Sequence, residues 1–506
     1  MHSESAAPAT MSQTLTKIAS VVGLTLFICW GCGKLDVAIN TKQTIAIGTF
    51  AATICTTLFF WNHRVAVAFA GLSVLIGAHA MTLDQVIHHT ELNIIFFLIG
   101  MMIIIGALKD LGFLTWIIQS IINRKKMTGM TFMIILCFLS AVLSSIVGEV
   151  SSIVVVMALV FQVCDTLKIN PIPFVMTSVL CTNIGSAATM LGNPVGVFIG
   201  SKAGFTFGQF LFGATPVALI CTVVSLAFLL IWYRKAIREM TVKMEEHRKM
   251  NKGLGPLVRL PYRLGLFVLT GTVVTIAFHH QIEAALGILG EGNQNAFLIM
   301  TPLLVAALLM IYRSKRAQYY VEKEVEWWTL LFFMLLFSIA GGLQVTGVTD
   351  NLATQLTKLI TGGPDAMVPF VIGISSVGSA FVDNIVFVAA FTPIIQSLVE
   401  RSIDYSILWW ALLFGACFGG NITAIGSTAN IVALGLLEKR GHACVAFLEW
   451  LKIGSIIGLI TGLIAWLMLS IMPVPKPVIH GSHGPVPEQH APAHNIQPLN
   501  LEPLNL

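Results

Sequence analysis

The chain has 506 residues, of which 56% are hydrophobic and only 10% are charged, and its mean hydropathy is +0.85. About 25% of the residues of a soluble domain are charged, so this chain has too little polar surface to cover a water-soluble core of its size. A soluble enzyme, a coiled coil and a disordered protein are excluded, and a net charge of +5 does not indicate a nucleic-acid partner. Because a transmembrane helix needs about 20 apolar residues, the sequence predicts an all-α polytopic protein embedded in a lipid bilayer.

The first half of the chain is expected to contain two parts. Residues 1–40 hold a polar segment and a first span; a cleaved signal segment is the alternative, but no convincing small-residue cleavage site follows the apolar run. Residues 41–233 hold further spans and a long apolar stretch, at about 127–165, which polar residues around Glu149 interrupt. Because basic residues flank both ends of that stretch, we expect a re-entrant helical hairpin, with two short complete spans as the alternative.

The second half is preceded by the densest basic run of the chain. Residues 234–263 carry nine Lys or Arg against three Glu and are expected to form a cytoplasmic loop. Residues 264–472 then repeat the plan of the first half, with a second hairpin at about 367–400 that is interrupted at Asp383. Residues 473–506 are rich in Pro and His and poor in apolar side chains, which predicts a disordered tail.

An internal repeat relates the two halves. Glu91 and Gly106 recur at a constant offset as Glu326 and Gly341, the two hairpin breaks overlie each other, and Asn183-Ile184 pairs with Asn421-Ile422 after a small gap. Basic loops fall on one side when the N-terminus is placed in the cytoplasm and the C-terminus outside. The repeat unit then contains an odd number of spans, so the second copy is inverted. We expect about 11 transmembrane helices plus two re-entrant hairpins, an architecture typical of secondary transporters in the inner (plasma) membrane.

Two acids mark the hairpin breaks, Glu149 and Asp383. Neither broken region contains a Lys or Arg, and a buried carboxylate without a basic partner must be protonated or hold a cation. Capping of the half-helix N-termini is the structural alternative, and the two roles are compatible. The pattern therefore favours a site coupled to protons or Na⁺, with no other cofactor.

Short polar side chains lie near both acids, and their oxygens suit Na⁺, whereas half-helix N-termini could equally bind an anion. The candidate ion- and substrate-binding residues are Glu149, Ser151, Asn183, Thr189, Asn193, Asp383, Asn384, Asn421, Thr423, Ser427 and Asn430. Within this set Asp383, Asn384 and Asn421 are the expected Na⁺ ligands. The absence of metalloprotease, Walker and hydrolase motifs argues against an enzyme or an ATP-driven pump. An intramembrane enzyme with an acid dyad would need the two carboxyl groups within hydrogen-bond reach.

Three motifs carry a resemblance to a known family. Residues 419–432, Gly-Gly-Asn-Ile-Thr-Ala-Ile-Gly-Ser-Thr-Ala-Asn-Ile-Val, resemble the second-half signature of the ArsB/NhaD-type permeases of the ion transporter superfamily. Residues 379–390 are similar to that family's second hairpin tip, and residues 182–194 are similar to its first-half Asn-Ile-Gly-Gly-Thr-Ala-Thr-Leu-Ile-Gly-Asp-Pro-Pro-Asn pattern. The sequence departs from the family at Glu149-Val150, where many members have Asp-Asn, and at Asn193, which replaces Asp.

This resemblance implies two hairpins, a site at the bilayer midplane, elevator-type movement and a homodimer of the kind common in the family. It implies a cation-coupled secondary transporter, and the paired acids favour a sodium–proton antiporter. The alternative is a permease for arsenite, antimonite or a carboxylate such as citrate. The expected substrate is accordingly a small inorganic ion or a small anion.

Overall fold

The computed structural model describes residues 11–33, 40–122, 127–250, 262–286, 296–360, 362–442 and 445–476. These residues form helices and no strand. Eight of the helices are long and apolar enough to cross a membrane, or ten when each of two bent pairs is counted as one span. The all-α polytopic class is thus confirmed. The count is below the predicted 11 because several segments break at polar residues into helices of 10–17 residues, such as Ile172–Ser186.

The first half contains 13 α-helices within the described residues. They are α1 (Met11–Gly33), α2 (Thr41–Phe59), α3 (Arg64–Gly77), α4 (Leu83–His88), α5 (Leu92–Asp110), α6 (Phe113–Ile122), α7 (Gly129–Val147), α8 (Glu149–Leu167), α9 (Ile172–Ser186), α10 (Pro194–Ala203), α11 (Phe207–Gly213), α12 (Thr215–Trp232) and α13 (Arg234–Lys249).

The second half repeats much of this order. Its main helices are α14 (Arg263–Ala277), α15 (His279–Ala285), α16 (Ala296–Tyr312), the π-helix η3 (Tyr320–Glu324), α18 (Trp327–Val345), α19 (Val348–Leu359), α20 (Gly363–Phe381), α21 (Asn384–Arg401), α22 (Ile407–Gly419), α23 (Thr428–Lys439) and α24 (Phe447–Ile471).

Two helical hairpins lie at the predicted breaks, and their helices α7, α8 and α20 are themselves among the eight that are long enough to cross a membrane; whether the hairpins are re-entrant stays a prediction. Helices α7 and α8 pack against each other and are joined by Gly148 alone, whose φ of 88° is a conformation that L side chains rarely adopt. Helices α20 and α21 are joined by Val382 and Asp383. Each break therefore falls where the sequence predicts it, at a Gly-Glu pair in one half and at Asp383 in the other.

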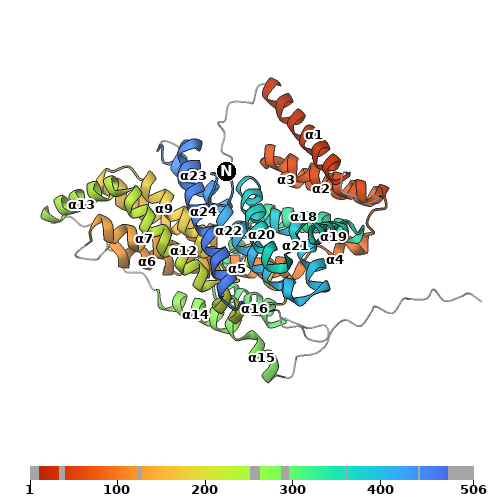
Figure 1. Ribbon diagram of the computed structural model, residues 1–506. Coiled ribbons are helices and arrows are strands. Elements are labelled where there is room, and N and C mark those ends of the chain that lie inside the picture. Colours follow the sequence, from red (N-terminus) through yellow and green to blue (C-terminus); the bar gives the residue numbers. More distant parts are fainter. Residues whose placement is uncertain are drawn as a thin grey trace, which may run out of the picture.

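The helices form two groups that meet along one interface. The hairpin group contains α7–α13 and α20–α24, which pack mainly on one another, and the flanking group contains α1–α6 and α14–α19. In Figure 1, α7, α9 and α12 lie on the left, α18 to α21 lie on the right, and α22 and α24 run between them. Contacts of α18 and α19 with α21, of α5 with α10 and of α6 with α8 join the two groups.

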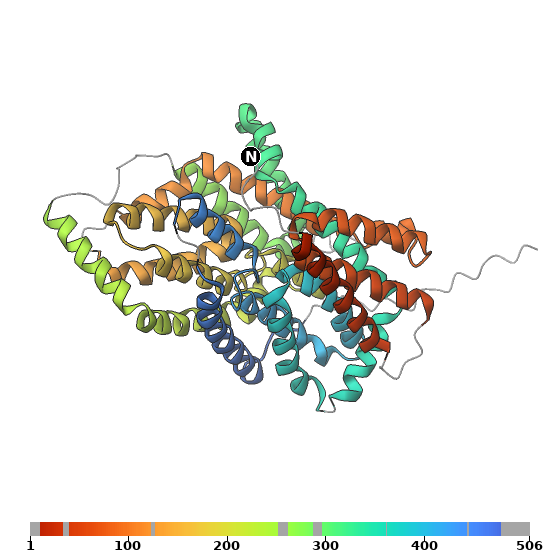
Figure 2. The same cartoon turned by 90° about the horizontal axis from the view of Figure 1, so that it is seen from above.

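The basic segment 234–263 is not simply a loop. Its first 16 residues form α13, which buries Ile237, Met240 and Met244 against α7 and α8 and keeps its charges exposed. Figure 2 shows α13 along the left rim of the molecule. Apolar residues at i, i+3 and i+7 place one apolar stripe on a helix that is otherwise strongly charged. Residues 251–261, the basic residues at 124–126 and residues 477–506 of the predicted tail lie outside the described residues. The first four residues of that tail, 473–476, are described, and Trp410 and Gln209 donate to the carbonyls of Pro475 and Lys476.

Reciprocal contacts show that the two halves are related by a pseudo-two-fold axis. Asn193 donates to the sulfur of Cys417, and the equivalent residue Ser427 donates to Asn183. Each residue and its counterpart are 234 positions apart, so the first contact maps onto the second when the halves are exchanged, as at an isologous interface. The constant offset thus pairs Asn183 with Cys417 rather than with Asn421, to which Asn183 is hydrogen bonded.

The repeat is inverted because α5 and α18 run in opposite directions. Lys109, at the end of α5, lines the same cavity as Glu326, just before the start of α18. Glu91, just before α5, likewise lies in a second cavity with Gln344, near the end of α18. The start of each helix is therefore beside the end of its counterpart.

Candidate functional site

The larger cavity lies between the two helix groups and has a volume of about 230 Å³. The flanking group contributes residues of α5, η3 and α18, and the hairpin group contributes both hairpin breaks and the starts of α10 and α23. Its polar lining residues are Lys109, Glu149, Ser151, Asn193, Lys323, Glu324, Glu326, Thr329, Asp383, Asn384 and Thr428. Both hairpin acids therefore face the same space.

Glu149 opens the second arm of the first hairpin without capping it. The N-cap position before it is Gly148, which has no side chain to cap the helix, and the backbone amide of Glu149 donates to the carbonyl of Gly192 at 3.0 Å. The residue is 7% exposed, and its Oε2 atom has no hydrogen-bond partner, although Ser186 lies within reach of the carboxyl group. A buried carboxyl oxygen without a partner is costly, so Glu149 is available to bind a proton or a cation.

Asp383 is held by the protein on both oxygens. Its Oδ1 accepts from the amide of Ile385 at 3.2 Å and so caps α21, while its Oδ2 accepts from the hydroxyl of Thr428 at 2.7 Å. The capping alternative is therefore correct for Asp383. The next residue, Asn384, accepts from Ser379 through its carbonyl oxygen, and its buried amide nitrogen has no partner.

Four of the predicted site residues form a buried hydrogen-bond network between the halves. Asn183 donates to Asn421 at 2.8 Å and to Asn430 at 2.9 Å, and it accepts from Ser427 at 3.0 Å. Asn421 donates from its amide nitrogen to the carbonyl of Leu180, and Asn430 donates to the carbonyls of Gly420 and Thr423. All four side chains are buried and none lines the cavity. Their hydrogen bonds join the broken segments of the two halves.

Two predicted threonines have equivalent roles in the hairpins. Thr189 donates to the carbonyl of Ser145 in the first hairpin and accepts from the amide of Leu191. Thr423 makes the same pair of contacts with Ala380 and Ile425 in the second hairpin. These hydroxyls therefore attach each hairpin to the loop beside it.

Five of the 11 predicted site residues line the cavity, namely Glu149, Ser151, Asn193, Asp383 and Asn384. The expected Na⁺ set is only partly brought together, because Asn421 points into the network with Asn183 whereas Asp383 and Asn384 face the cavity. Within the described residues, no group of three or more His, Cys, Asp or Glu side chains is arranged to hold a metal ion.

Sequence reasoning missed several residues of this site. Thr428 binds Asp383, and Glu326 adds a third carboxylate from just before α18. Arg64, at the start of α3, is 9% exposed and is close enough for its charge to interact with those of Asp383 and Glu326. The view that no base approaches the acids is therefore wrong, because it counted only bases within the broken segments. The recurrence of Glu91 as Glu326 was the signal that could have identified Glu326.

Four helix N-termini converge on the cavity. Helices α8, α10, α21 and α23 begin at Glu149, Pro194, Asn384 and Thr428, all of which line it. Each N-terminus carries partial positive charge, which favours an anion. One amide at each helix start is already bound within the protein, by the Gly192 carbonyl or by the side chains of Asn193, Asp383 and Ser427. The site thus offers carboxyl groups for a cation and helix ends for an anion.

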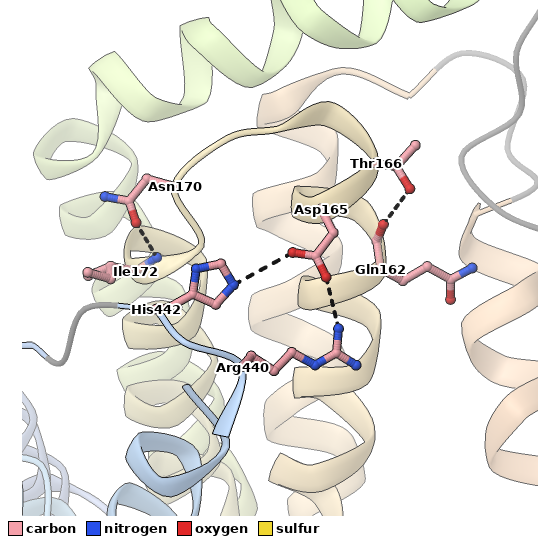
Figure 3. Close-up of polar contacts among 7 residues, drawn as sticks. All are labelled: Gln162, Asp165, Thr166, Asn170, Ile172, Arg440 and His442. Carbon is pink, nitrogen blue, oxygen red and sulfur yellow. Dashed lines mark hydrogen bonds and ion pairs between the residues drawn. The ribbon is translucent and has the colours of Figure 1, made fainter. Parts of the chain in front are cut away.

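A separate charged cluster joins the first hairpin to α23 at its far end. Asp165 binds Arg440 at 2.8 Å and lies 3.6 Å from His442, between the two side chains (Figure 3). The ring of Phe161 stacks on His442 and lies under the Arg440 guanidinium. Asp165 and Arg440 are about half exposed, and exposed pairs contribute about 0–1 kcal/mol. This cluster is a minor structural contact.

No hydrogen bond joins the carboxyl groups of Glu149 and Asp383 in the described part of the chain, since both oxygens of Asp383 are bound elsewhere and Oε2 of Glu149 is free. The inverted repeat, the paired hairpins and the cavity between two helix groups define the class of the protein, a membrane transporter.

Comparisons with known proteins narrow this class. The sequence profile of the CitMHS family, described as citrate transporter, matches residues 54–415. A 46 kDa membrane protein of Mycobacterium leprae is 32% identical over 445 residues, which cover 85% of this chain and all of that protein. An uncharacterized transporter of Mycobacterium tuberculosis is 31% identical and covers 82% of this chain and 95% of its own length. The chain belongs to the CitMHS family, part of the ion transporter superfamily.

Two more distant proteins share the fold or part of the sequence. The human P protein is 27% identical over 493 residues, which cover 82% of this chain and 58% of that protein. The crystal structure of the Alcanivorax borkumensis YdaH transporter, described as having an unusual topology, matches with a TM-score of 0.50 at 14% identity over 90% of this chain and 97% of that one. The narrower ArsB/NhaD assignment stays a prediction.

Proposed function

We propose that the protein is a cation-coupled secondary transporter of a small carboxylate, in which Glu149 binds the coupling proton or Na⁺ and Asp383 and Asn384 complete the site. The observation that carries this proposal is the cavity itself, which combines an unpartnered Oε2 of Glu149 with four helix N-termini. A carboxylate is favoured at the helix ends, and its charge is balanced by the cation on the acids.

The family description supports the carboxylate, since it names citrate. The balance between the charges of the carboxylate and the cation gives the physical reason why their transport would be coupled. A carboxylate that enters beside ionised Glu149 is repelled, whereas protonation or cation binding removes that repulsion, so substrate and cation bind best together. Movement of the hairpin group against the flanking group would carry the cavity from one side of the membrane to the other, as in an elevator.

Sodium–proton exchange of the ArsB/NhaD type is the second candidate. The cavity holds the carboxyl groups of Glu149, Glu324, Glu326 and Asp383 against the ammonium groups of Lys109 and Lys323, of which Lys109 is paired with Glu324 at 2.6 Å. An excess of acids over bases favours a cation without an accompanying anion. Arsenite and antimonite remain further substrates to test. A homodimer in the inner membrane with a cytoplasmic N-terminus completes the proposal.

Purified protein in liposomes separates these candidates. Labelled citrate uptake is measured under an imposed pH or Na⁺ gradient, and dye-reported proton movement on addition of Na⁺ is measured in the absence of citrate. Gradient-driven citrate uptake supports the leading proposal. Na⁺-dependent proton movement in the absence of a carboxylate supports sodium–proton exchange instead. If neither citrate uptake nor Na⁺-dependent proton movement is seen, both candidates are overturned.

A further inference from the structure

The second, smaller cavity has a volume of about 20 Å³ and lies at the opposite ends of α5 and α18. Residues of the large cavity recur here at positions 235 residues away. Glu324 and Glu326 correspond to His89 and Glu91, and Lys109 corresponds to Gln344. Three further pairs are Met102 with Phe337, Ile105 with Ala340 and Val154 with Ala389. The two cavities are therefore equivalent under the pseudo-two-fold axis, one large and one nearly filled.

Close packing fills the small cavity. The ring of His89 lies against Gly341, where an added Cβ would come within 2.4 Å of it. At the equivalent place in the large cavity, the side chain of Glu324 lies against Gly106 in the same manner. A residue just before α5 or α18 therefore packs against the other of these two helices in the same way at both cavities.

One ion pair crosses the two helix groups at the small cavity. Lys202, on α10 of the hairpin group, binds Glu91, which precedes α5 of the flanking group. Their side chains are only 23% and 15% exposed. Every other ion pair within the described residues joins partners of the same group. The hydroxyl of Thr392, which also lines this cavity, is buried without a partner.

We propose that the small cavity is the closed second entrance to the site and that the Glu91–Lys202 ion pair is the gate that holds it closed. This rests on the proposed transport function. Two inverted repeats that adopt different conformations can each take up the conformation of the other. When they do, the pair separates, the space around Ala389 enlarges, and the space around Val154 closes. The polar wall of Thr392 and Gln344 is then exposed to water.

Thiol labelling of solubilised, otherwise cysteine-free protein tests this proposal. Cysteine is placed at the equivalent positions Val154 and Ala389, which are 37% exposed and buried respectively, and its reaction with a charged methanethiosulfonate is followed. In the parent protein V154C is expected to react much faster than A389C. Adding Lys202→Ala is expected to raise A389C labelling about fivefold and to lower V154C labelling, because closed and open populations shift.

The control is Lys476→Ala, which removes an ion pair with Asp404 that stays within the hairpin group. It is expected to leave both labelling rates unchanged, and Lys202→Arg is expected to restore the parent pattern. Unchanged A389C labelling in Lys202→Ala overturns the gate, and so does an equal rise at both positions, which would indicate general loosening. Neither result requires a known substrate, so failure of the gate is distinguishable from failure of the flux assays.

Discussion

Glu149 and Asp383 stand at equivalent breaks of two inverted hairpins and line one cavity, yet only Asp383 is satisfied by the protein. Thr428 and the amide of Ile385 occupy both oxygens of Asp383, whereas Oε2 of Glu149 has no partner. The acids at the two breaks thus differ in their chemistry. Asp383 caps the second hairpin, and the unpartnered oxygen of Glu149 is the reason that the proposal gives this acid the coupling ion.

This difference predicts opposite effects of substitution on stability. Asp383→Ala removes the cap of α21 and the bond to Thr428 and is expected to lower the free energy of unfolding by about 1–3 kcal/mol. Glu149→Gln replaces a buried acid by a neutral group of similar shape and is expected to leave stability unchanged or slightly raised. Thermal unfolding in detergent measures both. A larger loss of stability in Glu149→Gln than in Asp383→Ala would contradict the assignment of the two roles.

Two glycines permit the hairpins to approach the broken segments closely. A Cβ on Gly185 would lie 2.2 Å from the carbonyl oxygen of Ala141, and one on Gly419 would lie 2.4 Å from Cα of Ser376. Because backbone atoms cannot yield cheaply, Gly185→Ala and Gly419→Ala are each expected to destabilise the protein by about 1–3 kcal/mol. Gly373→Ala, with nothing within 4 Å, is the matched control and should be neutral. Equal melting temperatures for all three variants would refute the close approach.

The Asn183 network predicts a loss of stability rather than a loss of ion affinity. In Asn183→Ala the side-chain oxygens of Asn421 and Asn430 lose their donor, at a cost of about 1–3 kcal/mol for each unpaired group. Asn170→Ala, which removes one bond from an exposed side chain, is expected to cost far less. Citrate and Na⁺ titrations of the folded Asn183→Ala protein should give affinities near those of the parent. A tenfold weaker Na⁺ affinity at parent stability would return Asn183 to the ion site.

His89 predicts a pH dependence of the second entrance. Burial, followed by the charges of His88 and Lys202, lowers the pKa of His89 from 6.5 to about 4. The closed entrance therefore favours neutral His89, and its stabilisation is present above about pH 6.5 and is lost as the pH falls toward 4. Acidification over this range should raise the ratio of A389C to V154C labelling, and His89→Gln should remove that response. A ratio that stays constant in the parent protein would contradict this coupling.

The fold was largely predictable because its helices, breaks and repeat are marked by residues that are close together or regularly spaced in the sequence. Apolar runs, the Gly-Glu pair at the first break and Asp383 at the second predict the helices and the two hairpins, and the recurrence of Glu91 as Glu326 predicts the repeat. The helix within the basic segment was not predicted because charge dominates the composition of residues 234–249, while three apolar residues at helical spacing pack α13 on the bundle.

The site was less predictable because polarity alone does not distinguish a ligand from a structural contact. Asn183 and Asn384 have similar neighbours in sequence. Asn183, however, is hydrogen bonded to three side chains of the other half, whereas Asn384 faces the cavity. Which of the two asparagine side chains faces the cavity depends on how the two halves of the chain pack together. Arg64 was missed for the same reason, since it reaches the acids from a helix more than 80 residues away in sequence.

The most direct test of the central claim compares two modes of citrate transport by parent and Glu149→Gln protein in the same liposomes. Exchange of external labelled citrate for internal citrate needs no net cation movement, whereas accumulation under a pH or Na⁺ gradient does. If Glu149 carries the coupling ion, Glu149→Gln retains exchange and loses gradient-driven accumulation by at least about tenfold. Accumulation at the parent level in Glu149→Gln would contradict the account.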